Sequence, residues 1–254
     1  MSILFKLFQR VRRFILSRGY TCDNCRAEVF EYPKIRLCTK CERKLDYNNR
    51  FTCPKCGRKT VASGVCLNCK TKTPAFFAGV SPFVYHGATA AFINRMKNGN
   101  RRLCAYFGEC MADECLSRFP NLKAEKLMLV YTPLTKKKRR SRGYNQAEEL
   151  AYSIAERMQS HGVFVELVND VLQKRKDVSL QKRLGYIQRF ENVQGNFHVH
   201  KRAVCRDKII VLIDDIMTTG ATGHECARLL MGAGAKEVYF LTAASLQEIK
   251  NQDL

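Results

Sequence analysis

Two adjacent carboxylates, Asp214 and Asp215, lie between a run of branched apolar residues and a threonine–glycine loop, in the stretch IIVLIDDIMTTGATG at 209–223. Small residues let such a loop curl, so that backbone N–H groups and threonine hydroxyls point at one phosphate beside a helix N-terminus. Carboxylates repel phosphate but accept hydrogen bonds from vicinal sugar hydroxyls. We therefore expect one sugar phosphate, with its hydroxyls on the aspartates and its phosphate on Met217, Thr218, Thr219, Gly220, Ala221 and Thr222.

Cysteine is the other residue type whose spacing predicts chemistry. Of 13 cysteines, eight form four Cys-x-x-Cys pairs, namely Cys22/Cys25, Cys38/Cys41, Cys53/Cys56 and Cys66/Cys69. One such turn directs two thiolates at an ion and two turns complete a tetrahedral site, so eight thiolates suit two structural zinc ions. We favour grouping neighbouring pairs over interleaving them, and both arrangements stay open. The odd count and the spacing favour metal binding in a reducing cytoplasm over a disulfide framework, with a redox dithiol as the weaker alternative.

The strongly positive net charge of the chain favours anionic partners. Lysine and arginine number 44 against 23 acidic residues, a net charge of +21, and residues 1–72 alone hold 17 basic and 5 acidic residues. A surface of this kind favours polyanions, which include nucleic acid, phosphorylated metabolites and anionic lipid. A solvated basic surface without a ligand is the alternative. No apolar run approaches the roughly 20 residues that cross a bilayer.

The first 19 residues predict a basic amphipathic helix, because their apolar side chains recur at helical spacing. Four cations between residues 6 and 13 leave no apolar core of the length that a signal peptide needs. Such a helix either lies on an anionic membrane surface or packs its apolar stripe on its own domain. We expect a cytoplasmic protein, with contact at the inner face of the membrane as a weaker hypothesis.

The chain as a whole predicts three segments, a helix over 1–19, a double zinc ribbon over 20–72 and an α/β domain over 76–246. Within the last, we expect strands at 80–85, 126–131, 209–213 and 237–243 and helices at 89–97, 103–119, 144–161 and 222–232. The apolar run at 209–213 suits a parallel strand buried on both faces. The aspartates and the loop then follow at the carboxyl end of that strand, where open α/β sheets bind ligands.

The stretch IIVLIDDIMTTGATG resembles the ribose-phosphate motif of type I phosphoribosyltransferases. The whole chain resembles the ComF family, which is linked to DNA uptake in natural competence. Matching segments are the cysteine ribbon, FVYHGATAAFINRMKNGN at 83–100, VYTPLTKKKRRSRGYNQAEELA at 130–151, and Gln181, Leu184, Arg189, Asn192 and Val193. The resemblance implies a type I phosphoribosyltransferase-like parallel sheet flanked by helices, with an N-terminal zinc-ribbon module.

The resemblance also implies roles for residues. Asp214 and Asp215 would bind the ribose hydroxyls of phosphoribosyl pyrophosphate (PRPP), directly or through Mg²⁺, while residues 218–222 cradle the 5′-phosphate. The pyrophosphate would lie near the turn at Tyr131 and Thr132. A mobile stretch at 136–146, which includes Lys137 and Arg142, would close over it and offset the charge of the leaving group. Asp214, Asp215 and Arg142 are therefore the catalytic candidates. Thr218 replaces an acidic residue of purine-salvage relatives, which argues against purine transfer.

Two functions stay open at this point. One is an enzyme that transfers a phosphoribosyl group to an unidentified acceptor with Mg²⁺. The other is a non-catalytic DNA-uptake factor that uses the fold to bind PRPP or single-stranded DNA. Tyr144 and Phe83 are candidate platforms for base stacking, with core packing as the better default for Phe83. The resemblance implies a DNA-uptake helicase or other competence proteins as partners.

Overall fold

The computed structural model describes residues 21–29, 36–49, 51–175, 190 and 193–248. Its centre is a sheet of the order β1-β8-β7-β3-β4, with β2 also paired to β8, and every pairing in it is parallel. The strands are β1 (Ala78–Val80), β2 (Phe83–Val84), β3 (Lys126–Tyr131), β4 (Phe164–Leu167), β7 (Ile209–Met217) and β8 (Glu237–Ser245). The predicted α/β fold with a parallel sheet is confirmed.

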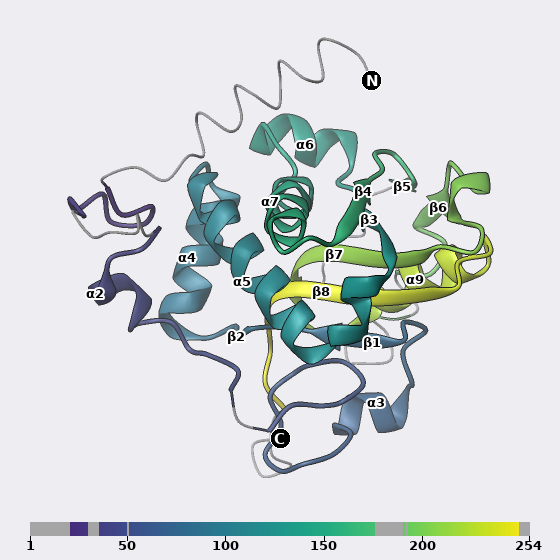
Figure 1. Ribbon diagram of the computed structural model, residues 1–254, viewed down its shortest axis with the longest axis horizontal. Helices are drawn as coiled ribbons and strands as arrows, with labels where there is room; N and C mark the ends of the chain where they lie inside the picture. The colour runs from purple at the N-terminus through teal and green to yellow at the C-terminus, as the bar shows by residue number, and fades with distance from the viewer. Residues whose placement is uncertain (1–20, 30–35, 50, 176–189, 191–192, 249–254) are drawn as a thin grey trace.

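Helices cover both faces of this sheet (Figure 1). Helices α4 (Gly87–Lys97), α5 (Arg102–Arg118) and α7 (Gln146–Ser160) pack on one face, and α9 (Ala221–Met231) packs on the other. Alternate residues of β7 serve the two cores, because Val211 belongs to the first core and Leu212 to the second. The run at 209–213 is therefore buried on both faces, as its composition predicts.

Smaller elements complete the described structure. A separate two-stranded sheet of β5 (Leu172–Lys174) and β6 (Phe197–Val199) is antiparallel, and β6 contacts α9. Short helices are α2 (Thr39–Glu42), α3 (Leu67–Thr71) and α6 (Lys136–Arg142), with 3₁₀ turns η1 (Pro120–Ala124) and η2 (Ala203–Cys205). None of the described helices is long and apolar enough to cross a membrane. The helix predicted for residues 1–19 lies outside the described residues, as does the matching segment at 181–189.

Three predicted boundaries differ from the structure for local reasons. The strand expected at 80–85 is two strands, β1 and β2, interrupted where Pro82 has no N–H to donate to β8. Helix α7 begins at Gln146 instead of residue 144, because the Asn145 side chain accepts a hydrogen bond from Ala147 N and caps it. Strand β7 continues to Met217, so both aspartates lie in the strand and not in a loop after it.

The chain reverses its direction of travel across the sheet between β3 and β7. From β3 it passes through α7 to β4 on one side, whereas from β7 it passes through α9 to β8 on the other. The carboxyl ends of β3 and β7 are adjacent, because Thr132 N donates to Ile213 O over 2.9 Å. Ligands of open α/β sheets bind in the crevice at such a switch point.

The described residues of the cysteine-rich segment share the two cores of the sheet and form no separate core. Cys22, Cys41 and Leu37 are buried in the same core as α4, α5 and α7, while Cys53 and Cys66 are buried in the core that contains α9. In Figure 1, accordingly, α2 lies beside α4 and α3 lies below β1. The boundary between residues 20–72 and 76–246 stays a prediction.

Candidate functional site

The two aspartates lie at the switch point, near the end of β7. Asp215 Oδ2 is 3.1 Å from Lys97 Nζ, at the last turn of α4, and both side chains are about four-fifths buried. The Asp214 Oδ1 atom accepts a hydrogen bond from the Asp215 backbone N at 2.9 Å. One carboxylate is therefore paired with a lysine, while the other is held by the backbone next to it.

Burial, followed by the charge of Asp215, raises the pKa of Asp214 to about 7. The hydrogen bond with Thr132 and the charge of Lys97 act in the opposite direction. An ionised Asp214 thus lacks a full counter-charge in the free protein. Sugar hydroxyls or Mg²⁺ would supply what it lacks, and carboxylate oxygens are ligands that Mg²⁺ prefers. The donor set at this position fits a hydrated Mg²⁺ ion carried by a phosphate ligand.

The predicted phosphate loop joins β7 to α9. Gly220 has φ of +87°, a left-handed conformation that favours glycine, and it is the N-cap of α9. Ala221 N donates to Thr219 Oγ1 over 3.3 Å. Gly223 lies against the Phe240 ring, where a Cβ atom would come within 2.5 Å of a ring carbon. The first turn of α9 is thereby seated closely on the sheet, with its N-terminal N–H groups directed toward the crevice end of β7.

Hydrogen bonds connect the segment 142–146 to α4 and to the turn after β3. Asn145 Nδ2 donates to Thr132 O over 2.9 Å, which fixes the turn after β3. The Tyr144 hydroxyl donates to Met96 O, and Gln146 Nε2 donates to Lys97 O over 3.4 Å. This motif therefore positions Lys97 and Thr132 around the aspartates. Tyr144 is 5% exposed, so its proposed role in base stacking is wrong, whereas Phe83 is 0% exposed and packs in the core, as its default interpretation predicts.

Tyr131 and Thr132 end β3 as predicted, but the Tyr131 side chain is turned into the core beside α7. Its hydroxyl donates to Glu148 Oε1 over 3.3 Å, and burial raises its pKa. Burial also raises the pKa of Glu148, although Arg139, 3.0 Å from Glu148 Oε2, opposes that shift. The backbone of residues 131–132, rather than the tyrosine ring, is thus what this turn presents to the crevice.

The stretch predicted to be mobile at 136–146 begins as helix α6. Thr135 Oγ1 accepts from Lys138 N over 3.3 Å at its start, and Gly143, with φ of +76°, ends it. None of its seven residues is buried, and Lys137 is exposed. Arg142 Nη1 donates to Gln146 Oε1 over 3.0 Å, so the structure pairs this catalytic candidate with α7. The contact of Lys137 or Arg142 with a pyrophosphate stays a prediction.

Lys97 is the functional candidate that sequence reasoning missed. It belongs to the segment 83–100, which resembles the family only as a whole. A lysine in the last turn of a helix is ordinarily explained by the helix dipole. Only the fold brings it to Asp215, 118 positions further along the chain.

The eight predicted cysteine ligands form two groups. Within each group every Sγ atom lies within 4.8 Å of the others, and the groups are Cys22, Cys25, Cys38, Cys41 and Cys53, Cys56, Cys66, Cys69. The structure thus groups neighbouring pairs, without interleaving. Sγ atoms are separated by 3.8 Å between Cys25 and Cys38 and by 3.7 Å between Cys56 and Cys66. Tetrahedral zinc with bonds of about 2.3 Å requires about 3.8 Å. Both groups therefore fit a tetrahedral metal ion.

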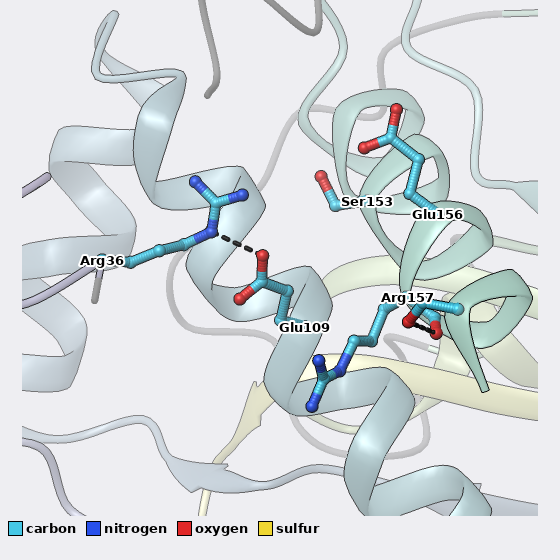
Figure 2. Close-up of a pocket in the computed structure, with 6 residues that line it drawn as sticks. Arg36, Glu109, Ser153, Glu156 and Arg157 are labelled. Atoms are coloured by element: carbon cyan, nitrogen blue, oxygen red, sulfur yellow. Dashed lines mark hydrogen bonds and ion pairs between the residues drawn. The ribbon is translucent and has the colours of Figure 1, made fainter. Parts of the chain in front are cut away.

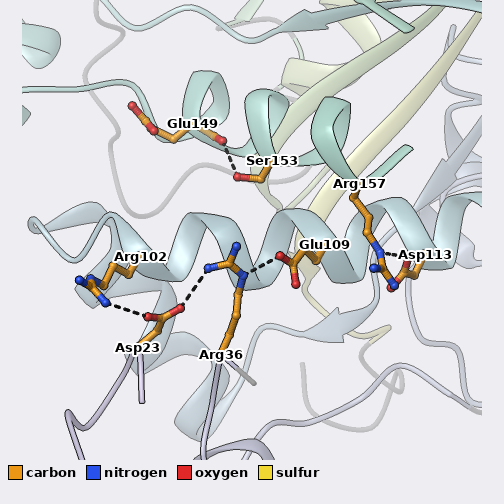
Figure 3. Close-up of polar contacts among 8 residues, drawn as sticks. All are labelled: Asp23, Arg36, Arg102, Glu109, Asp113, Glu149, Ser153 and Arg157. Atoms are coloured by element: carbon orange, nitrogen blue, oxygen red, sulfur yellow. Dashed lines mark hydrogen bonds and ion pairs between the residues drawn. The ribbon is translucent and has the colours of Figure 1, made fainter. Parts of the chain in front are cut away.

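The first cysteine group is docked on α5 by ion pairs (Figure 3). Arg36 Nε lies 2.6 Å from Glu109 Oε1, and Asp23 receives both Arg36 at 3.5 Å and Arg102 at 3.7 Å. Asn100 Nδ2 also donates to Asp23 O over 2.8 Å, which ties this group to the loop after Lys97. This docking supports the α4–α5 corner from outside the crevice.

A small cavity of about 140 Å³ lies between Arg36, α5 and α7 (Figure 2). Its lining is Arg36, Glu109, Ser153, Glu156, Arg157 and Ser160. Arg36 donates a hydrogen bond to Glu109 (Figure 2). Arg157 forms paired hydrogen bonds with Asp113 (Figure 3). The cavity shares no residue with the aspartates or the threonine loop, so it is separate from the candidate site.

Comparison with known proteins identifies the family. A family model described as "Phosphoribosyl transferase domain" matches residues 110–250. "Competence protein ComFC" of Bacillus subtilis (strain 168) is 27% identical over 210 residues, covering 80% of each chain. "Competence protein ComFC" of Streptococcus pneumoniae is 30% identical over 210 residues, covering 80% of this chain and 84% of the relative.

Among solved structures, the B. subtilis glutamine PRPP amidotransferase complexed with ADP and GMP is similar with a TM-score of 0.36 and 19% identity. That alignment covers 57% of this chain and 27% of the other. The family model itself spans more than half of this chain, including α7, β7 and α9, and the two competence proteins match most of it. The chain therefore belongs to the ComF family of proteins with a phosphoribosyltransferase fold.

Proposed function

We propose that this protein binds PRPP, with Mg²⁺, in the crevice between β3 and β7. The observation that carries the proposal is the order of features at the end of β7. Two partly buried carboxylates are followed within six residues by a left-handed glycine and a helix N-terminus, which suit opposite ends of a ribose 5-phosphate. The ribose hydroxyls meet Asp214 and Asp215, and the 5′-phosphate meets residues 218–222.

The pyrophosphate is assigned to the turn at residues 131–132 and to the nearby cations. Lys97 Nζ lies 3.1 Å from Asp215 Oδ2, beside the carboxyl end of β7. When PRPP binds, this ammonium group would leave the carboxylate and pair with an oxygen of the pyrophosphate. Helix α6 supplies further cations, including Lys137 and Arg142, within a short exposed element that ends at Gly143. Mg²⁺ carried by the ligand would neutralise part of the pyrophosphate and the ionised aspartates.

Chemistry at this site would be transfer of the phosphoribosyl group. The bond from the anomeric carbon to the pyrophosphate oxygen breaks, the electron pair leaves with pyrophosphate, and an acceptor atom bonds to the same carbon. Cations near the leaving group and carboxylates near the oxocarbenium-like sugar lower that barrier electrostatically. The acceptor is unassigned, and Thr218 offers no carboxylate for handling a purine proton.

We further propose zinc for the two cysteine groups. Four thiolates at tetrahedral spacing form the ligand set of structural zinc sites. In both groups the first cysteine of the second pair opens a short helix, α2 after Cys38 and α3 after Cys66. The ions would therefore hold knuckles that the surrounding apolar side chains alone do not close.

A second candidate function is DNA uptake without turnover, and helix α6 favours it. Six of its seven residues are basic and none is buried, which is a surface suited to the phosphates of single-stranded DNA. The names of the two bacterial relatives, both competence proteins, agree with that role. A DNA-uptake helicase or another competence protein would then be the partner, in the cytoplasm or at its membrane.

Calorimetric titration with PRPP and Mg²⁺ tests binding, and release of pyrophosphate tests turnover. Asp215→Asn is expected to weaken PRPP binding by about tenfold or more, because it removes a carboxylate of the crevice. Asp207→Asn, the same change at an exposed turn, is the matched control and should bind as the wild type does.

The outcomes separate the two functions. Pyrophosphate release that is lost in Asp215→Asn supports the enzyme. PRPP binding without release, together with binding of single-stranded DNA that Asp215→Asn leaves intact, supports the accessory factor. Failure of the wild type to bind PRPP would contradict the site itself.

A further inference from the structure

A buried arginine connects the second cysteine group to the phosphate loop. Arg58 follows the knuckle Cys53–Cys56 and Gly57, and its Nη2 donates to Thr218 O over 2.7 Å, across 160 positions of sequence. The side chain belongs to a residue that is only 4% exposed, and its Nε is buried without a hydrogen-bond partner. Burying a cation is costly, so a guanidinium directly behind an anion-binding loop calls for a functional explanation.

The knuckle that carries Arg58 is fixed rigidly against the sheet. Cys53 N donates to Arg58 O over 2.9 Å, and Gly57 N donates to Cys53 O over 2.9 Å. Gly57 has φ of +75°, and a Cβ atom there would lie 2.5 Å from Gly79 O in β1. Asn48 Nδ2 also donates to Gly57 O over 2.7 Å. The position of Arg58 is thus set by the same turn that presents two sulfurs of the cysteine group.

The segment after β8 makes a second connection. Leu246 N donates to Met217 O over 3.0 Å, and Glu248 N donates to Lys59 O over 3.0 Å. The Glu248 side chain in turn accepts from Leu67 N over 2.6 Å, at the first residue of α3, between Cys66 and Cys69. Both knuckles of the second group therefore support the start of the phosphate loop.

These contacts decide the orientation of two peptide groups. In a planar trans peptide the C=O and the following N–H point in opposite directions. Because Thr218 O is held by Arg58, the N–H group of Thr219 is directed away from the cysteine group. Met217 O is held by Leu246 N directly after β8, which fixes the preceding Met217–Thr218 peptide. An N–H group directed in this way is available to an anion bound at the loop. The positive charge of Arg58 behind the loop adds to its attraction for phosphate.

We propose that metal occupancy of the second cysteine group regulates phosphate affinity at the loop, with Arg58 as the positioning residue. Loss of metal releases the knuckle, withdraws Arg58 from Thr218 and frees the peptide to rotate. The inference rests on the proposed binding of a ribose phosphate at this loop. The first cysteine group docks on α5 and on the loop after Lys97 instead. Among the residues that the structure describes, the second group alone is connected to the phosphate loop in this way.

The first test measures affinity for ribose 5-phosphate by calorimetry in the metal-loaded protein. Arg58→Gln should weaken binding about tenfold, within the usual range of coupling between two sites, and Arg58→Lys should recover part of it. Lys59→Gln is the matched control, because it removes the neighbouring charge, which faces Asp46 at 3.8 Å and not the loop. Metal content and circular dichroism, recorded for each variant, distinguish a loosened loop from an unfolded chain.

The second test uses the unmodified protein and relies on reciprocity. If metal favours the ligand, the ligand must favour the metal by the same factor. Saturating ribose 5-phosphate should therefore raise the affinity of one of the two metal equivalents in competition with a chelator. The other equivalent should be unaffected, and Arg58→Gln should remove the effect.

The outcomes are separable from those of the proposed function. If the wild type does not bind ribose 5-phosphate, the proposed site and this regulation are both overturned. If it binds, but neither metal equivalent responds and Arg58→Gln binds as tightly as Lys59→Gln, only the regulation is overturned. The regulation is supported if ribose 5-phosphate protects one of the two metal equivalents from the chelator and if Arg58→Gln removes that protection.

Discussion

At the scale of residues, the two adjacent aspartates of the candidate site carry an electrostatic cost in the free protein. Asp214 is held beside Asp215 in a partly buried position, and burial and that neighbour raise its pKa to about 7. Lys97 compensates Asp215 directly, at 3.1 Å, whereas Asp214 is held by a backbone N–H. Titratable groups with displaced pKa values concentrate at functional sites, which agrees with a ligand that brings hydroxyls and a cation to Asp214.

This cost predicts that replacing Asp214 stabilises the protein at high pH more than at low pH. Asp214 is protonated in the fold up to about pH 7 but ionises near pH 3.8 in the unfolded chain, so stability falls as pH rises through that window. Asp214→Asn removes the penalty. It should raise the free energy of unfolding at pH 8 by at least about 1 kcal/mol relative to its effect at pH 4.5.

Thermal unfolding of the two proteins at both pH values measures the difference. Asp207→Asn, at an exposed turn, should show no such pH-dependent gain. If the effect of Asp214→Asn on the free energy of unfolding is the same at pH 8 as at pH 4.5, Asp214 is adequately compensated in the free protein and the prediction is contradicted.

At the scale of elements, the turn after β3 and the helix α7 depend on one side chain. Asn145 caps α7 through Oδ1 and fixes Thr132 O through Nδ2. Its residue is 2% exposed, so neither bond is easily replaced by water. The amide is thus both a stabilising cap and the support of the proposed pyrophosphate turn.

Two substitutions separate these functions of Asn145. Asn145→Ala should lower the free energy of unfolding by about 1–2 kcal/mol, because it removes the cap, and should also weaken PRPP binding. Asn145→Ser keeps a capping acceptor and loses the donor to Thr132 without burying a charge. It should therefore weaken PRPP binding with a smaller loss of stability, as measured by calorimetry and urea unfolding. PRPP affinity unchanged in both variants would contradict the supporting role.

Helix α6 predicts how binding to single-stranded DNA depends on salt. Replacing Lys136, Lys137 and Arg140 by glutamine removes three exposed charges. The slope of log affinity against log salt should then fall by about 2, because each phosphate neutralised by a cation contributes roughly 0.7 to it. The matched control replaces Lys123, Arg206 and Lys236, which are exposed elsewhere. Equal changes of slope in both triple variants, measured by fluorescence anisotropy, would mean that the whole basic surface binds and α6 has no special part.

At the scale of the whole molecule, the cysteine groups are integral to the fold. Each lies in a different core, one with α5 and α7 and the other with α9, so metal loss affects both faces of the sheet. Chelation should lower the unfolding temperature of the entire chain by about 10 °C or more while calorimetry still detects one transition. A second transition that keeps the temperature of the metal-loaded protein would show that the α/β part folds without the cysteine groups.

The sequence predicts local elements well, but it predicts poorly which distant residues come into contact. The buried strand at 209–213 and the two cysteine groups each follow from neighbouring residues, and so does the family. The cap of α7 at Asn145 is not predicted, and the sequence places the start of that helix at residue 144 instead of Gln146. The contact of Lys97 with Asp215 and that of Arg58 with Thr218 each join residues more than a hundred positions apart, so they depend on the tertiary fold. Tyr144 is an aromatic residue of the kind that stacks on bases. Its structural role becomes visible only in the fold, where its hydroxyl donates to Met96 O.

The most direct test of the central proposal is a crystal structure with PRPP and Mg²⁺. We expect the 5′-phosphate within hydrogen-bond distance of the backbone N–H groups of residues 218–222, with both ribose hydroxyls facing Asp214 and Asp215. Pyrophosphate should lie between the turn at residues 131–132 and Lys97. A ligand seated on α6 or in the cavity beside Arg157, with the crevice of β3 and β7 empty, would contradict the proposal.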